Sequence, residues 1–152
     1  VLMIFDSWGG ITTKDNYLNF SLSYVKKIIA TLKAKHPHVP VIFFTKGGGQ
    51  WLIEMAESGC DAISLDWTVD LAQAKQLVGD RVALQGNLDP CVLLAEKKVI
   101  RTEVAKVLAA FGHGSGHVFN LGHGITPDVP PEHLSEMIHA VLELSPAYHM
   151  TE

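Results

Sequence analysis

The chain has 152 residues, 47% of them apolar and 18% charged, which suits one domain with a sizeable core. Its formal charge of −4 excludes a basic surface for nucleic acid or for a membrane, and no apolar stretch approaches the roughly 18 residues of a membrane span. Cys60 and Cys91 form no CxxC pair, which is typical of a reducing compartment. The cytoplasm is therefore the predicted location.

Five short apolar runs each lead into a loop of polar or glycine residues. The first two, residues 1–5 and 41–44, are apolar without alternation, which is typical of strands covered on both faces. Roughly 20 to 40 residues separate neighbouring runs, too many for hairpins and enough for helical crossovers. The sequence therefore predicts an α/β fold of parallel βα units. The functional site is expected in the loops after the strands: residues 6–10, 45–49, 66–68, 85–90 and 120–124.

The intervening helices are predicted from apolar spacing and from the residues that end each run. The first has a spacing that includes Phe20, Tyr24 and Ile28, and it stops at His36-Pro37 because proline cannot continue a helix. Three more helices are predicted to end at glycines in the left-handed C-cap conformation: Gly59, Gly79 and Gly112. The last helix begins at Pro130-Pro131, and five of its residues are predicted to point inward: Leu134, Met137, Ile138, Val141 and Leu142.

Five βα units do not close a barrel, because the common closed form has eight. The residues alone leave two architectures open, an open doubly wound sheet and part of a barrel. The chain begins with a strand-like run at Val1 rather than with Met. We therefore expect it to be a piece of a longer protein.

Five segments closely resemble the uroporphyrinogen decarboxylase family, in order along nearly the whole chain. They read FDSWGG at 5–10, FTKGG at 44–48, GCDA at 59–62 with LDWT at 65–68, LQGNLDP at 84–90, and NLGHG at 120–124 with PDVPPEH at 127–133. The resemblance implies a TIM (β/α)8 barrel that acts as a homodimer without cofactor. Residues 1–152 then form its carboxyl-terminal part, about five βα units, and the amino-terminal units are absent.

The resemblance also implies a reaction. The family removes the four acetate carboxyls of uroporphyrinogen III to give coproporphyrinogen III in haem biosynthesis. A pyrrole protonated beside the side chain takes up the electrons, so zinc, pyridoxal phosphate and nicotinamide are unnecessary. The family's catalytic carboxylate and its arginine clamp come from the amino-terminal part. No catalytic residue is therefore assigned here, and the isolated chain is expected to be inactive.

The distribution of positive charge agrees with an incomplete site. Of the 12 Lys and Arg residues, only Lys46 lies in a predicted loop after a strand. One lysine cannot clamp a substrate that carries eight carboxylates. A complete site therefore needs cations from outside this chain, an inference that does not depend on the family.

Two residues are predicted to bind substrate because they match the family's binding residues. Ser7 in FDSWGG supplies a hydroxyl that can donate to an acetate or propionate oxygen. His123 in NLGHG supplies an imidazole donor between glycines that let substrate approach the backbone. Without the family context, a serine in such a loop is more often a turn or cap residue than a binding residue. A histidine between glycines is as often a loop residue without a function as it is a site residue.

Two other functions stay open. Zinc-dependent corrinoid or thiol methyltransferases share this barrel, but the loops at 45–48 and 121–124 lack their thiolate ligands. Metal binding is also not predicted for His113, His117 and His123, because the segment 112–117 has the sequence of a flexible turn.

The second of these other functions is that of a catalytically incomplete binding or assembly module.

Other conspicuous residues are expected to have structural roles. Gly47, Gly48 and Gly49 lack the spacing of a phosphate-binding loop and are predicted to allow close packing of strand and helix. Capping or loop bracing is predicted for three acidic residues: Asp66, Asp89 and Asp128. Core or dimer contacts are predicted for the three tryptophans: Trp8, Trp51 and Trp67.

Overall fold

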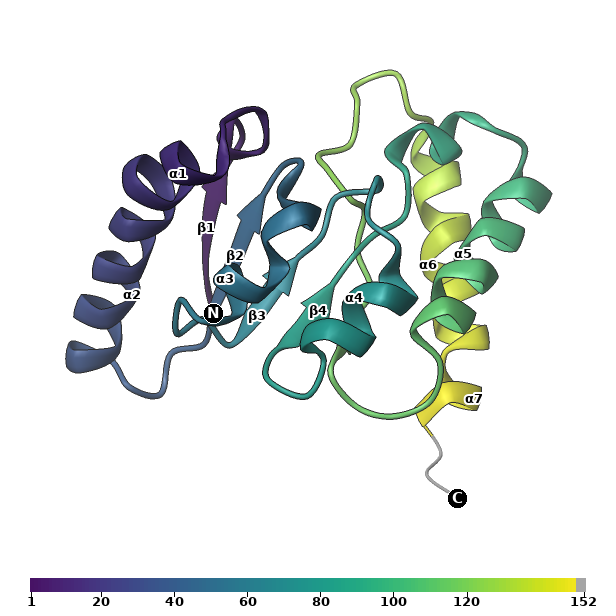
Figure 1. Ribbon diagram of the computed structural model, residues 1–152. Coiled ribbons are helices and arrows are strands. Elements are labelled where there is room, and N and C mark those ends of the chain that lie inside the picture. Colours follow the sequence, from purple (N-terminus) through teal and green to yellow (C-terminus); the bar gives the residue numbers. More distant parts are fainter. Residues whose placement is uncertain (150–152) are drawn as a thin grey trace.

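The computed structural model describes residues 1–149, and its centre is a sheet of five parallel strands (Figure 1). They are β1 (Leu2–Asp6), β2 (Val41–Thr45), β3 (Ala62–Ser64), β4 (Ala83–Gln85) and β5 (His117–Val118). Each strand pairs in parallel with the next one along the chain. The predicted parallel βα units are therefore confirmed.

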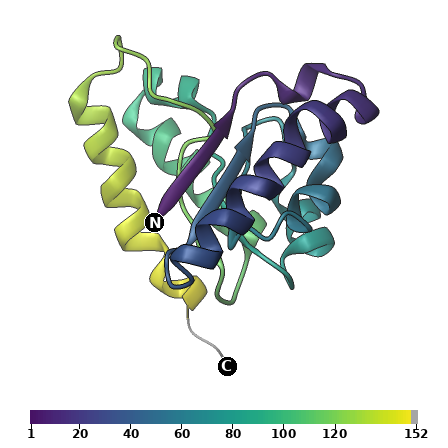
Figure 2. The same cartoon turned by 90° about the vertical axis from the view of Figure 1, so that its left-hand side faces the viewer.

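The order of the strands decides between the two architectures. It runs β1-β2-β3-β4-β5 without a reversal, whereas a doubly wound sheet changes direction at a switch point. Right-handed crossovers that all step the same way place their helices on one face of the sheet. This is the winding of a TIM barrel, of which the chain forms about five consecutive βα units. Figure 2 views them from the β1 end, where β1 is an edge strand.

Helices connect and follow the strands. The longer ones are α2 (Ser23–Lys35), α4 (Leu71–Val78), α5 (Lys97–Phe111) and α6 (Pro131–Leu144). The shorter ones are η1 (Gly9–Ile11), α1 (Lys14–Tyr17), η2 (Leu18–Leu22), η3 (Gly48–Trp51), α3 (Leu52–Ala56), η4 (Pro90–Leu94) and α7 (Pro146–His149). Within residues 1–149, no helix has the length and apolar character needed to cross a membrane.

The first helical segment contains a π-helical turn that the sequence did not predict. The turn is η2, between α1 and α2, and it widens the helix by one residue. Val25 and Ile29 of α2 face the core, while Phe20 of η2 and Tyr24 and Ile28 of α2 are exposed. The apolar spacing is therefore helical as predicted, but these three residues form a stripe that no element of residues 1–149 covers.

The three helices end at or near the predicted glycines, but the predicted left-handed conformation is not general. Gly59 and Gly112 have φ angles of +88° and +73°, in the range that favours glycine. Gly59 follows the end of α3 by two residues beyond its C-cap, Glu57, and the ψ of −160° at Gly112 lies outside the left-handed region. Gly79 caps α4 as predicted but has φ −68°, so the predicted conformation is wrong there and at Gly112. A Cβ at Gly79 would lie 2.6 Å from the backbone oxygen of Lys75, so this glycine is required for space rather than for its φ angle.

Helix α6 begins at the predicted prolines but buries fewer residues than predicted. Met137 and Ala140 are buried, and the helix packs mainly against α5. Ile138 and Leu142 are 46% and 67% exposed, so the prediction that they point inward is wrong. The apolar spacing correctly predicts a helix, but no other element of residues 1–149 covers the side of α6 that carries Ile138 and Leu142.

The core lies between the helices and one face of the sheet. Val41, Phe43, Ile63 and Leu84 point from the strands into this layer. There the rings of Tyr17 and Trp51 stack with centroids 4.1 Å apart, and the Tyr17 hydroxyl hydrogen-bonds the Thr45 hydroxyl at 3.0 Å. A second cluster joins α5 and α6 through residues that include Ile100, Val104, Leu108 and Ala140.

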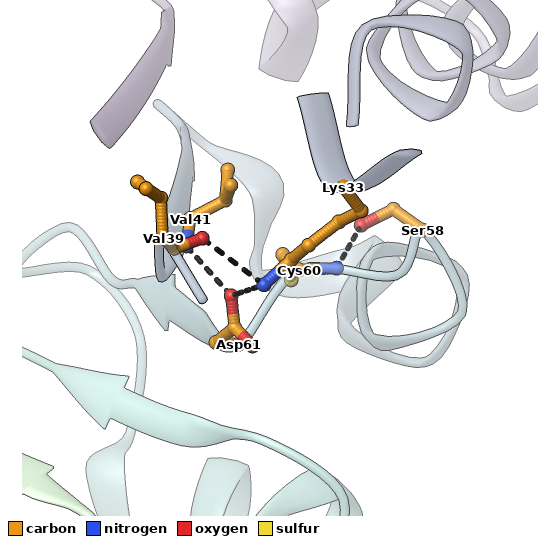
Figure 3. A network of polar contacts seen from close by, with 6 residues as sticks. All are labelled: Lys33, Val39, Val41, Ser58, Cys60 and Asp61. Atoms are coloured by element: carbon orange, nitrogen blue, oxygen red, sulfur yellow. Dashed lines mark hydrogen bonds and ion pairs between the residues drawn. The ribbon is translucent and has the colours of Figure 1, made fainter. Parts of the chain in front are cut away.

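A polar network closes the amino-terminal end of the sheet (Figure 3). Asp61 accepts hydrogen bonds from the Val41 backbone at 2.6 Å and from Lys33 Nζ at 2.5 Å, and Nζ also donates to the Val39 carbonyl at 3.2 Å. Burial opposes ionisation of Asp61, but these bonds outweigh it and hold its pKa below the ordinary value. The network ties α2 to the starts of β2 and β3.

Candidate functional site

A cavity of about 520 Å³ opens at the carboxyl end of the sheet, on the face away from the core. Met3, Phe5, Phe44 and Ser64 line it from the strands, in positions that alternate with the buried residues of the other face. The loop 120–125 and two residues of α6 complete the lining. The loops after the strands therefore surround a pocket, as the fold class predicts.

Ser7 lines this cavity from the loop after β1. The preceding residue, Asp6, shapes that loop: one carboxylate oxygen accepts the backbone N–H groups of Trp8 and Gly9 at 3.2 and 2.8 Å. The other oxygen accepts the Ser21 hydroxyl at 2.5 Å. No role was predicted for Asp6 from the sequence, although an aspartate that bonds the backbone two residues later is a recognised turn signal.

The loops after β1 and β2 are joined through their backbones. Lys46 N–H donates to the Asp6 carbonyl, and Gly10 N–H donates to the Lys46 carbonyl, each at 3.0 Å. A Cβ at Gly10 would lie 2.0 Å from the Lys46 oxygen. Close packing also explains two of the three consecutive glycines. A Cβ at Gly48 would lie 2.9 Å from Thr45 of β2, which is the predicted packing of strand and helix, and a Cβ at Gly49 would lie 2.8 Å from Val69 in the loop after β3.

Asp66 braces the loops after β2 and β3. Its carboxylate is buried and accepts Gly47 N–H, the Thr68 N–H at 2.8 Å and the Thr68 hydroxyl at 2.5 Å. Asn87, in the loop after β4, joins that loop to the loop after β3: its amide donates to the Asp66 and Val69 carbonyls at 2.8 and 2.7 Å. The predicted bracing role of Asp66 is confirmed. Asp89 likewise caps η4 by accepting the N–H of Cys91 at 2.9 Å.

His123 lines the same cavity from the loop after β5. Its ring meets those of Phe44 and Trp67 edge-on, at centroid distances of 6.1 and 6.0 Å. Gly122 packs so closely on the loop after β3 that a Cβ would lie 2.4 Å from Trp67 N. Nothing lies within 4 Å of a Cβ at Gly124. The backbone before His123 therefore packs tightly against the loop after β3, and the backbone after His123 has no atom of residues 1–149 packed against it on this side.

The tryptophans differ in their surroundings. Trp51 lies in the core as predicted, whereas Trp8 is 72% exposed. Trp67 stands beside the cavity, where Lys46 Nζ lies 5.7 Å from its ring centroid. This is a cation–π distance, so the ring of Trp67 contacts both the lysine and His123. The one lysine predicted in a strand-end loop therefore lies beside the ring that meets His123, a residue of the cavity lining.

The prediction that His117 lies in a flexible turn is wrong, because His117 lies in β5. Its ring stacks on Phe111 at 4.5 Å, and its Nε2 hydrogen-bonds the Gly86 carbonyl at 2.8 Å. Burial lowers the pKa of His117, and the positive charge of Lys75 acts in the same direction. Across residues 1–149, no three or more His, Cys, Asp or Glu side chains form a group that could hold a metal ion.

A sheet wound in one direction, with a pocket at the carboxyl ends of its strands, defines a barrel-type α/β protein whose strand-end loops surround a pocket. The family model for uroporphyrinogen decarboxylase matches residues 1–144. The chain belongs to the uroporphyrinogen decarboxylase family.

Individual relatives agree with this family. The chain is 62% identical to a uroporphyrinogen decarboxylase of Legionella pneumophila (strain Lens), over 98% of this chain and 42% of the relative. It is 57% identical to that of Methylococcus capsulatus, over 99% of this chain and 43% of the relative. The chain thus spans less than half the length of these curated relatives.

A solved structure shares the fold. A methyltransferase from Methanosarcina mazei superposes with a TM-score of 0.79 at 21% identity, over 93% of this chain and 42% of that chain. At this identity the likeness concerns the fold alone. It therefore adds nothing in favour of the methyltransferase alternative.

Proposed function

We propose that this chain is the carboxyl-terminal part of an enzyme that decarboxylates the four acetates of uroporphyrinogen III to give coproporphyrinogen III. One observation carries the proposal beyond family membership. Ser7 and His123, the positions that match the family's substrate-binding residues, come from the first and last strand-end loops and line one cavity. The relatives that are 62% and 57% identical to this chain also bear the name of this enzyme.

The proposed roles follow from the chemistry of the side chains. The Ser7 hydroxyl and the His123 imidazole donate hydrogen bonds to carboxylates of the substrate. The apolar lining from Met3, Phe5 and Phe44 excludes water around the tetrapyrrole, which strengthens these bonds. Lys46, next to the Trp67 ring that meets His123, adds positive charge near this end of the cavity.

The catalytic carboxylate is proposed to come from the amino-terminal part of the enzyme. Loss of CO2 requires a protonated pyrrole beside the acetate, and an anion near the pyrrole N–H groups stabilises that cation. The cavity lining supplied by residues 1–149 contains no Asp or Glu. The carboxylates of Asp6 and Asp66 at this end of the sheet are already bonded to backbone and hydroxyl groups. Neither is therefore placed for this role.

The remaining barrel units are proposed to cover surfaces that this chain leaves open. Phe5 is 67% exposed although it points into the cavity. Edge strand β1 and the stripe of Phe20, Tyr24 and Ile28 lie at one end of the sheet, and Ile138 lies on α6. In Figure 1, α2 lies at one end of the row of elements and the pair α5 and α6 at the other, as expected where units are missing between these ends. The homodimer and the absence of a cofactor stay predictions from the family, and the cytoplasmic location stays a prediction from the composition of the chain.

Turnover of uroporphyrinogen III tests the proposal. The complete polypeptide is expected to release coproporphyrinogen III, measured by chromatography after oxidation, and to keep its rate after dialysis against a chelator. The 152-residue chain alone is expected to be inactive. A complete polypeptide without this activity would refute the proposal. Stoichiometric zinc, with activity lost on its removal, would favour the methyltransferase alternative.

A further inference from the structure

Ser64 is one of the polar residues that line the cavity. It lies on β3, opposite Phe44 of β2 and Gln85 of β4. Its side chain belongs to the cavity lining, yet the residue is only 4% exposed. Its strand neighbours in the lining, Met3, Phe5 and Phe44, are apolar. Ser64 is thus a buried polar group in an apolar wall.

The hydrogen bonds around Ser64 leave its proton available. Gln85 Nε2 donates to Ser64 Oγ at 3.1 Å, and Gln85 is itself only 5% exposed. The same Nε2 lies 3.8 Å from the sulfur of Met3, a weak acceptor. If the Gln85 amide were flipped, its oxygen would face the Met3 sulfur, and two acceptors would then lie against each other. The observed orientation of the amide is therefore favoured. Ser64 Oγ therefore accepts this bond, and its O–H remains as a donor toward the cavity.

A buried donor of this kind needs an acceptor, because an unmade hydrogen bond in an apolar environment is costly. We propose that Ser64 is a further substrate-binding residue, whose hydroxyl donates to the carboxylate of an acetate side chain at the cavity floor. The inference rests on the proposed function. It also specifies which substituent enters deepest, namely the acetate that must be shielded from water before it loses CO2.

The chemistry predicts which kinetic constant depends on Ser64. A hydrogen bond to a carboxylate is strongest while that group carries its full charge, before CO2 leaves. The bond therefore stabilises bound substrate more than the transition state, and its loss raises KM without lowering kcat. Coproporphyrinogen III has methyl groups in place of acetates, so its binding does not use this hydroxyl.

The test compares Ser64→Ala with wild type in the complete enzyme. We expect KM for uroporphyrinogen III to rise about tenfold, kcat not to fall, and the inhibition constant of coproporphyrinogen III to stay unchanged. Ser23→Ala is the matched control, because the Ser23 hydroxyl bonds the Asn19 carbonyl on an exposed helix. Its constants are expected to equal those of wild type.

Two results would overturn the inference while the proposed function stands. One is an unchanged KM in Ser64→Ala. The other is weaker binding of both tetrapyrroles together with a lower kcat, which would indicate a packing role for the Ser64–Gln85 pair. Wild-type enzyme that fails to decarboxylate uroporphyrinogen III would instead refute the proposed function, and this inference with it.

Discussion

The two ends of the sheet use polar side chains in different ways. At the amino end, the atoms of Lys33 and Asp61 are bonded to each other and to the backbone (Figure 3). At the carboxyl end, Asp6 and Asp66 hold the loops, while Ser7, Ser64 and His123 line a cavity. Substitutions at the amino end should therefore change stability, and substitutions at the cavity should change binding and turnover.

The largest effect is expected for Gly122→Ala in the complete enzyme. Its Cβ would meet Trp67 N at 2.4 Å, so the loop must move and carry His123 with it. We expect kcat/KM to fall about a hundredfold, as a displacement of about 1 Å can cost. Gly124→Ala is the comparison variant: Gly124 also lines the cavity, but its Cβ meets no atom of residues 1–149 within 4 Å, so the loop should keep its position and kcat/KM should fall less than in Gly122→Ala. Equal rates in the two variants would contradict the fixed position of the loop.

His123→Ala should have the next largest effect, since it removes a donor to a carboxylate. We expect kcat/KM to fall by roughly one to two orders of magnitude. Ser7→Ala should cost about tenfold or less, and Ser7→Thr should retain most activity because it keeps the hydroxyl. Steady-state kinetics on protein shown to be folded by circular dichroism provide the measurement. Wild-type rates in His123→Ala would remove the histidine from the proposed site.

Asp61→Asn tests the other end of the sheet. The variant loses the ion pair with Lys33, which is partly exposed and should stabilise the fold by about 1 kcal/mol. Chemical denaturation should show this loss at pH 7 and a smaller one as the pH falls toward the lowered pKa of Asp61. Turnover at a temperature where both proteins are folded should be unchanged. A large fall in kcat would show that the two ends are not independent.

The smallest expected effect is the pH dependence of stability due to His117. Its pKa is lowered in the folded state, so the unfolded chain binds the proton more tightly. The stability that neutral His117 supports is therefore present above its unfolded pKa of about 6.5 and lost as the pH falls through it. Thermal melts at pH 7.5 and 5.5 measure this loss. His117→Phe keeps a ring against Phe111 and should show a smaller difference between the two pH values; an unchanged difference would exclude His117 as its source.

The sequence predicted the strands because short apolar runs and polar or glycine loops are local signals. It predicted the location of Ser7 and His123 because parallel strands bring their following loops to one end. The π-helical turn at η2 and the exposure of Ile138 could not be predicted, since apolar spacing marks a helix face but not what covers it. Ser64 was missed because one serine within an apolar run gives no signal until the strand register sets it beside Gln85.

A structure of the complete enzyme with a bound tetrapyrrole would show whether the cavity is the substrate site. We expect the macrocycle to occupy the cavity at the carboxyl end of the sheet, with substituent carboxylates within hydrogen-bonding distance of Ser7 and the His123 imidazole. Its outer edge should approach Lys46, and no tetrapyrrole should contact the network of Lys33 and Asp61. A macrocycle bound elsewhere, with Ser7 and His123 both free of carboxylate contacts, would refute the proposed site.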